Sequence, residues 1–202
     1  MGPLSDTVRL DGRLARTERS RTAVVDALLD LLDDGALKPT AADIATRAHV
    51  SLRLVFQHFK DLESLFAAAA ERQMERLAEL LTPVPPTGPL AERVQMFVRQ
   101  RTRLLERITP VRRAAVRVEP FSKEVRDRLR RARALKRAEV EQVFATELDR
   151  HSAGERRELA AALAMVTSWP AWETLRHHQG LSGDHARRVM ARTITALLEA
   201  RR

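Results

Sequence analysis

The stretch that decides the fold is residues 39–66, PTAADIATRAHVSLRLVFQHFKDLESLF. Thr40 stands before an acidic first turn, so it predicts the N-cap of a short helix that runs to Ala48. Ser51 predicts a second N-cap, which starts another short helix over residues 52–59. Two short helices joined by a tight turn are typical of a helix-turn-helix. The sequence therefore predicts this motif in the first third of the chain.

The segment before this stretch predicts the remaining helix of the motif. Apolar side chains recur every three or four residues from Val24 to Leu32, and Gly35 suits the left-handed residue that ends a helix. Residues 1–16 show no sustained period, and we expect them to form a flexible basic N-terminal arm. Residues 17–66 are then the helix-turn-helix domain. Its small core is predicted to contain Ile44, Ala45, Val50, Val55 and Phe59.

The rest of the chain also has the pattern of helices. A fourth helix is predicted over about 62–81, and four prolines within residues 83–89 predict a loop after it. Pro110 and Pro120 predict further helix breaks. The predicted fold class is all-α, without a sheet: a three-helix N-terminal domain and a six-helix C-terminal domain over 67–202. The other helices are expected at about 90–108, 111–118, 121–150, 153–178 and 183–200.

The composition excludes several classes of function. The chain has no cysteine, which excludes disulfides, thiolate metal sites and cysteine nucleophiles. Glu173 and His177 lie one helical turn apart, but two ligands are too few for zinc. There is no nucleophile elbow and no phosphate-binding glycine loop, so the sequence predicts neither an enzyme nor a cofactor. Without a long apolar segment or a signal peptide, we expect a soluble cytoplasmic protein that does not contact the membrane.

The net charge of +9 is unevenly distributed along the chain. Residues 1–66 contain 9 Lys and Arg against 10 Asp and Glu, whereas residues 67–202 contain 27 against 17. The positive charge is concentrated in residues 99–137, where 15 basic residues face 4 acidic ones. This stretch is either an arginine-rich solvated helix face or a site for an anionic ligand, such as an acyl-CoA-like thioester or an organic acid.

The second short helix has the dimensions of a DNA-reading helix. In the major groove of double-stranded DNA, an Arg side chain donates two hydrogen bonds to guanine and a Gln pairs with adenine. Thr40, His58 and Lys60 are predicted to contact phosphates. The side chains expected on the exposed face of this helix are Leu52, Arg53, Leu54, Gln57 and His58.

The same stretch resembles the signature of the TetR family of regulators. The matching residues are Thr40, Asp43-Ile44-Ala45, Val50-Ser51, Phe56-Gln57-His58-Phe59-Lys60, Glu63 and Leu65, with a fainter match over 168–172 and 180–182. The resemblance implies three helices for DNA and six for ligand binding and dimerisation. It implies a repressor that binds a palindromic operator as a homodimer through its last two helices and is released by a small-molecule effector.

Two sets of residues in the C-terminal domain are candidates for these roles. Pro170 is also expected to kink the penultimate helix, because proline removes an amide donor.

The residues at helical spacing that would form the dimer seam are Ala162, Met165, Trp169, Trp172, Ala186, Val189, Met190, Thr193 and Leu197. An effector cavity would be lined by Met74, Phe97, Arg101, Phe121, Phe144 and Trp169, each of which is otherwise a core residue or a solvated arginine.

Three positions depart from the family pattern. His49 replaces the usual glycine of the turn, Phe56 replaces a tyrosine, and Leu62 replaces a lysine that generally touches a phosphate. Arginines within residues 13–21 could compensate from the N-terminal arm. With the charge of −1 over residues 1–66, these departures keep a second hypothesis open: a degenerate member that binds small molecules or proteins and binds DNA weakly.

Overall fold

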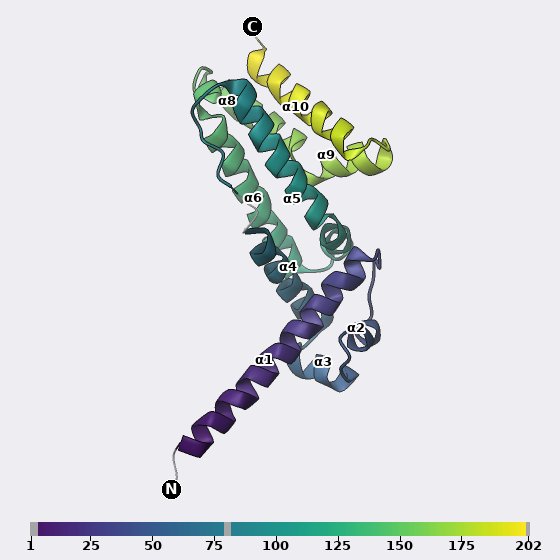
Figure 1. Cartoon of the computed structure of the whole chain (residues 1–202). Coiled ribbons are helices and arrows are strands. Elements are labelled where there is room, and N and C mark those ends of the chain that lie inside the picture. Colours follow the sequence, from purple (N-terminus) through teal and green to yellow (C-terminus); the bar gives the residue numbers. More distant parts are fainter. Residues whose placement is uncertain (1–3, 79–81, 201–202) are drawn as a thin grey trace. The chain divides into compact units, whose positions relative to one another are not determined.

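The computed structural model describes residues 4–78 and 82–200, with the side chains of residues 14–78 and 82–200 (Figure 1). All of its regular elements are helices, and no strand occurs in these ranges, so the all-α prediction is confirmed. No helix in these ranges is long and apolar enough to span a bilayer. The helices are α1 (Leu4–Asp33), α2 (Ala41–Arg47), α3 (Leu52–His58), α4 (Leu62–Ala78), α5 (Leu90–Val118), α6 (Lys123–Val143), α7 (Ala145–Leu148), α8 (Ala153–Val166), α9 (Trp169–Glu173), the π-helix η1 (Thr174–His178) and α10 (Gly183–Glu199).

The chain forms two compact units. The first unit contains the chain up to Ala78 together with residues 110–125, and the second unit contains residues 79–109 and 126–202. Helix α4 and residues 110–118 of α5 therefore pack with the helix-turn-helix, as expected for the predicted helices over 62–81 and 111–118.

The core of the first unit lies between α1 and the short helices. Four of the five predicted core residues are buried, and Val50 is half-buried against them. Helix α1 supplies Val24, Leu28 and Leu32 to this core, while α5 supplies Val111 and Ala114. The buried residues named in the prediction are Ile44, Ala45, Val55 and Phe59.

Helix α1 begins much earlier than the sequence suggested. Residues 4–16 are helical, so the expectation of an arm that precedes the first helix is wrong for them. Residues 1–3 lie outside the described part. Extending an existing helix adds one hydrogen bond per residue without a new nucleation cost, so a continuing apolar period is not required. At the other end, Gly35 has φ +92. The Ala36 amide donates to the Leu31 carbonyl at 2.9 Å, which closes the helix as predicted.

Helix α5 continues through Pro110, so the predicted break there is wrong. The proline leaves the Glu106 carbonyl without its usual amide donor. In the neighbouring turn, the Thr109 hydroxyl donates to the Leu105 carbonyl at 2.6 Å. The two halves of the helix are each held by an apolar core, through Leu105 in the second unit and Val111 in the first. Burial on both sides of the proline stabilises a helix that the local sequence disfavours.

Pro170 interrupts the penultimate helix, but not by a kink at its own position. Helix α8 ends at Val166, and the Ser168 hydroxyl accepts from the Ala171 amide at 3.4 Å as the N-cap of α9. Pro170 then lies in the first turn of α9, where its missing amide would have no partner within the helix. The expected interruption is confirmed, and its place is corrected to residues 167–168. The helix expected over 121–150 is likewise divided, into α6 and α7.

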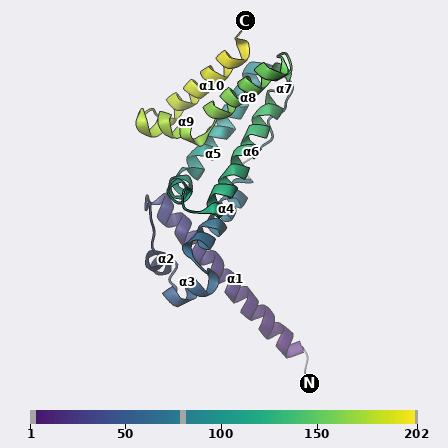
Figure 2. The ribbon, with the colours of Figure 1, turned by 180° about the vertical axis from the view of Figure 1, so that it is seen from behind.

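The second unit is built around α5, α8 and α10, which lie side by side in Figures 1 and 2. Phe97 and Phe144 form the centre of its core, with their ring centroids 5.3 Å apart in an edge-to-face arrangement. Trp172, Leu163 and Met190 are fully buried around them. This packing accounts for the apolar periodicity of all three helices.

A buried ion pair joins separate parts of the second unit. Arg93 and Glu147, whose side chains are 3% and 4% exposed, pair through both guanidinium Nη atoms and both carboxylate oxygens. Arg93 Nη1 also donates to the Val143 carbonyl at 2.7 Å, and its Nε donates to the Gly88 carbonyl at 3.1 Å. The proline-rich loop, the start of α5 and the end of α6 are thus tied to one guanidinium.

We predict that Glu147→Ala destabilises the protein by about 3–5 kcal/mol, because it leaves the Arg93 charge buried without a counter-ion. The double variant Arg93→Met/Glu147→Leu should recover most of the loss, since no charge then remains. Urea denaturation followed by circular dichroism measures both values. A single variant as stable as the unaltered chain would contradict the structure of this pair.

Candidate DNA-binding surface

Helix α2 starts at a capping box made by Thr40 and Asp43. The Asp43 amide donates to Thr40 Oγ1 at 3.2 Å, and the Thr40 amide donates to Asp43 Oδ2 at 2.9 Å. The Thr40 hydroxyl also donates to Oδ2 at 2.7 Å. These bonds, that of the hydroxyl first, lower the pKa of Asp43. Thr40 is exposed as predicted, but its hydroxyl and amide are both engaged in the cap, so a phosphate must compete with Asp43 for them.

The turn between α2 and α3 depends on His49. The Val50 amide donates to the Ala45 carbonyl at 3.0 Å and the His49 amide donates to the Thr46 carbonyl at 3.2 Å, which together form a Schellman motif. His49 has φ +54 and is the only non-glycine with a positive φ in the described part of the chain. The position where the family pattern has glycine therefore has the left-handed backbone that favours glycine.

We predict that His49→Gly stabilises the protein by up to about 1 kcal/mol. The left-handed conformation costs an L-residue about 1–2 kcal/mol, and the greater freedom of glycine in the unfolded chain offsets part of the gain. His49→Val should destabilise, because a β-branched residue tolerates this conformation least. Thermal melting of both variants measures the effect. A glycine variant that melts below the unaltered protein would contradict the assignment.

Helix α3 has one exposed polar face, and its opposite face is buried through Val55. The Ser51 hydroxyl caps it by accepting from the Leu54 amide at 3.2 Å, and Val55 is buried against the first-unit core. Arg53 and Gln57, one turn apart, are both exposed. Of the other residues predicted on this face, Leu52 and Lys60 are exposed, and Leu54 is half-buried. The sequence analysis missed Phe56 as a surface residue, although it is 51% exposed.

His58 packs against α1 more closely than the sequence analysis expected. It is half-buried, and its Nε2 lies 2.7 Å from the Ser20 hydroxyl of α1. Arg21 of α1 stacks over the ring of the next residue, Phe59, with 5.0 Å between the guanidinium carbon and the ring centroid. These contacts fix the end of α3 on α1. A phosphate contact by His58, which stays a prediction, is left to the other ring nitrogen.

The start of α4 is shaped by Asp61 and Leu62. The Ser64 amide donates to Asp61 Oδ1 at 2.7 Å, and this backbone bond is the main cause of the lowered pKa of Asp61. Leu62 is half-buried and packs against the first-unit core. Glu63 accepts a short hydrogen bond from the Ser122 hydroxyl, which also accepts from the Val125 amide at the start of α6. Leu62 therefore serves packing where the family pattern has a phosphate-binding lysine.

The predicted effector-binding residues do not form one group. Phe97, Phe144 and Trp169 lie in or against the second-unit core, and the Arg101 guanidinium carbon is 4.7 Å from the centroid of the Phe97 ring. Met74 and Phe121, in the first unit, are 46% and 90% exposed. The residues predicted to line an effector cavity were Met74, Phe97, Arg101, Phe121, Phe144 and Trp169.

Arg101 is the member of this group with an unusual environment. Its side chain is 3% exposed, and it bonds to Glu139 at 3.2 Å and to the carbonyls of Thr167 and Lys136. Its Nε is buried without a hydrogen-bond partner. Burial lowers the pKa of Arg101, while Glu139 opposes this shift. Among the described residues, no three His, Asp or Glu side chains converge as a metal site would require.

Comparison with solved structures shows which proteins have a similar fold. A transcriptional regulator from Rhodococcus sp. Rha1 superposes with a TM-score of 0.69 at 19% identity, over 89% of this chain and 96% of its own. A TetR-family regulator from Streptomyces coelicolor has a TM-score of 0.70 at 19% identity, over 89% and 80%. One from Pseudomonas syringae has a TM-score of 0.59 at 19% identity, over 88% and 94%. No protein-family model and no curated protein matches the sequence.

The chain is thus an all-helical protein with an N-terminal helix-turn-helix. Its fold is that of the TetR-family transcriptional regulators.

Proposed function

We propose that this protein is a transcriptional regulator that reads operator DNA with α3. The observation that carries the proposal is the exposed pair Arg53 and Gln57, one turn apart on a capped helix that Val55 anchors to the core. Side chains of these two types recognise guanine and adenine in the major groove. The likeness in fold to TetR-family regulators supports the same role.

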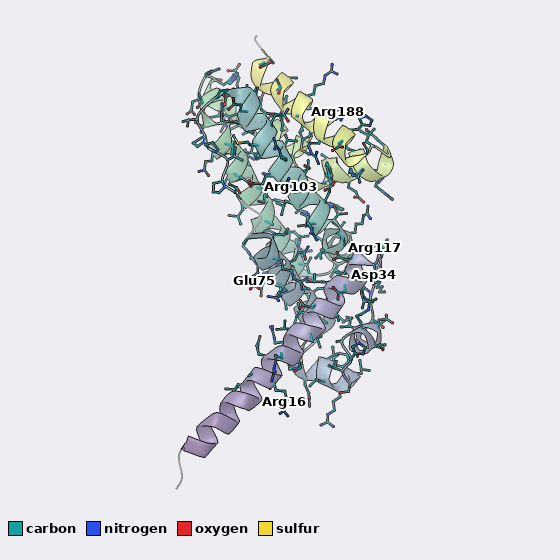
Figure 3. The ribbon with its side chains drawn as sticks, viewed as in Figure 1. Arg16, Asp34, Glu75, Arg103, Arg117 and Arg188 are labelled. Atoms are coloured by element: carbon teal, nitrogen blue, oxygen red, sulfur yellow. The ribbon has the colours of Figure 1, made fainter. Side chains whose placement is uncertain are left out.

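Phosphate contacts in this proposal come mainly from α1 and from Lys60. Arg16 (Figure 3) and Arg19 are exposed on α1, and Lys60 is exposed just after α3. Leu62 adds no charge, and the residues up to Phe66 have a net charge of −1. We therefore expect a shallow salt dependence of DNA affinity and a large contribution from base contacts.

We predict that Arg53→Ala weakens binding to the operator by about 1–3 kcal/mol and relaxes specificity at one base position. Fluorescence anisotropy with DNA that flanks the protein's own gene, and with single-base variants of it, measures both effects. Arg157→Ala, an exposed arginine of α8, is the matched control and should bind normally. An equal loss on every sequence would make Arg53 a phosphate contact.

A palindromic operator requires a two-fold partner, and we propose that α8 and α10 supply it. Met165 of α8 is 64% exposed and Val189 of α10 is 41% exposed, while Thr193 and Leu197 continue the α10 stripe. Trp172, Ala186 and Met190, expected at the seam, are instead buried inside the unit. An apolar face of this kind is typical of an isologous helix-pair interface.

We predict that Met165→Glu/Val189→Glu converts the dimer to a monomer, because two charges would be buried at the seam. Light scattering at micromolar concentration measures the mass. Leu135→Glu, on a 70% exposed residue of α6, is the matched control and should stay dimeric. An unaltered chain that is already monomeric would contradict the proposed assembly.

The second candidate function is a small-molecule or protein-binding module with weak DNA affinity. It is favoured by Thr40, whose hydroxyl and amide are bonded within the protein, and by His58, one of whose ring nitrogens is bonded to Ser20. The packing of Leu62 favours it as well. Under our proposal a small-molecule effector releases the operator. A folded dimer that binds neither the flanking DNA nor its variants would favour the second candidate.

A further inference from the structure

A surface groove runs between α5 and α10 in the second unit. It is shallow and largely open to solvent, with a volume of about 440 Å³. None of its lining residues belongs to α3, and one of them, Ala191, is also part of the second-unit core. Its lining residues are Gln95, Arg188, Ala191, Arg192, Thr195, Ala196 and Glu199.

The groove concentrates positive charge on one helix face. Arg188 (Figure 3) and Arg192 stand one turn apart on α10, and both are exposed. In the described part of the chain, no Asp or Glu forms an ion pair with either. Arg187, by contrast, pairs with Asp184 at 2.8 Å and donates to the Thr102 hydroxyl. Like charges at this spacing repel, so the pair is stabilised by a bound anion.

Helix α5 adds donors from the opposite wall. Gln95 lines the groove with its side-chain amide. Arg99 follows Gln95 by one helical turn and is exposed, but it is not among the residues that line the groove. The Thr195 hydroxyl completes the set from α10. Guanidinium, amide and hydroxyl groups are the donors that hold phosphate and carboxylate oxygens.

Glu199 is the only acidic residue among those that line the groove, and it lies at one end. Glu199 lies seven residues after Arg192, which is about 10 Å along the helix axis. Its carboxylate repels a second anionic group there but does not reach the arginine pair. The groove therefore favours a ligand whose negative charge is gathered at one end.

We propose that this groove binds a small molecule through an oxyanion, a phosphate or a carboxylate, held by Arg188 and Arg192. The planar guanidinium fork matches both oxyanions with two parallel hydrogen bonds. The site goes beyond DNA recognition and does not depend on it. Val189 and Thr193 lie on a neighbouring stripe of α10, so the proposed dimer face adjoins the groove but shares no lining residue with it.

The test is calorimetric titration of the full chain, without DNA and at constant ionic strength, with two probes. Inorganic pyrophosphate and tricarballylate represent the phosphate and carboxylate sources, and the tighter probe identifies the source. Arg188→Ser/Arg192→Ser should lower affinity at least about tenfold, because two charge-assisted donors are lost. Glu199→Gln should raise it about twofold, the value expected for one charge about 10 Å away in water.

Arg150→Ser/Arg157→Ser is the matched control, since both arginines are exposed in the same unit and away from the groove. It should leave the affinity unchanged. Melting curves and light scattering check that every variant stays folded and keeps its oligomeric state. The proposal is overturned if neither probe binds, if the groove variant binds as tightly as the control, or if it changes the oligomeric state, because the arginines would then belong to a subunit contact.

Discussion

The apolar stripe of α1 is the constraint on which the candidate DNA-binding surface depends. Helices α2 and α3 have seven residues each, too few to be stable alone in water. Their positions are set by burial of Ile44 and Val55 against Leu28 and the other stripe residues. The exposed face of α3 exists because the opposite face is fixed in this way. Loss of packing in α1 would therefore disturb the orientation of Arg53 and Gln57 without changing either residue.

What the sequence could predict was decided by local chemistry. The caps at Thr40 and Ser51, the helix ends at Gly35 and His49, and the exposure of Arg53 and Gln57 all follow from a few neighbouring residues. Each depends on side-chain to backbone hydrogen bonds or on backbone sterics, which act over one turn. The exposed face of α3 was therefore predictable from residues 39–66 alone.

What the sequence could not predict depends on contacts between distant residues. A proline rule predicts a break at Pro110, but burial of Leu105 and Val111 in two cores overrides it. Arg93 and Glu147 are 54 residues apart, and nothing in their local patterns distinguishes them from solvated charges. Arg101 belongs to the same class, because its burial follows from the placement of α6 and of the α8–α9 junction. The expectation of a solvated arginine face for residues 99–137 therefore fails at Arg101.

Helix α5 belongs to both cores, and this matters for the proposed regulation by an effector. It contributes Leu105 to one core and Val111 to the other, only about 9 Å apart along its axis, with Pro110 between them. A proline removes one hydrogen bond from the helix there, so bending at this point costs less than elsewhere along α5. In the second unit, the same helix carries Arg93 and Arg101 and one wall of the α5–α10 groove. A ligand can shift an equilibrium only by its differential affinity for two states. Under the proposed function, an effector must therefore bind the states of α5 unequally. The polar contacts of α5 in the second unit are where that difference can arise.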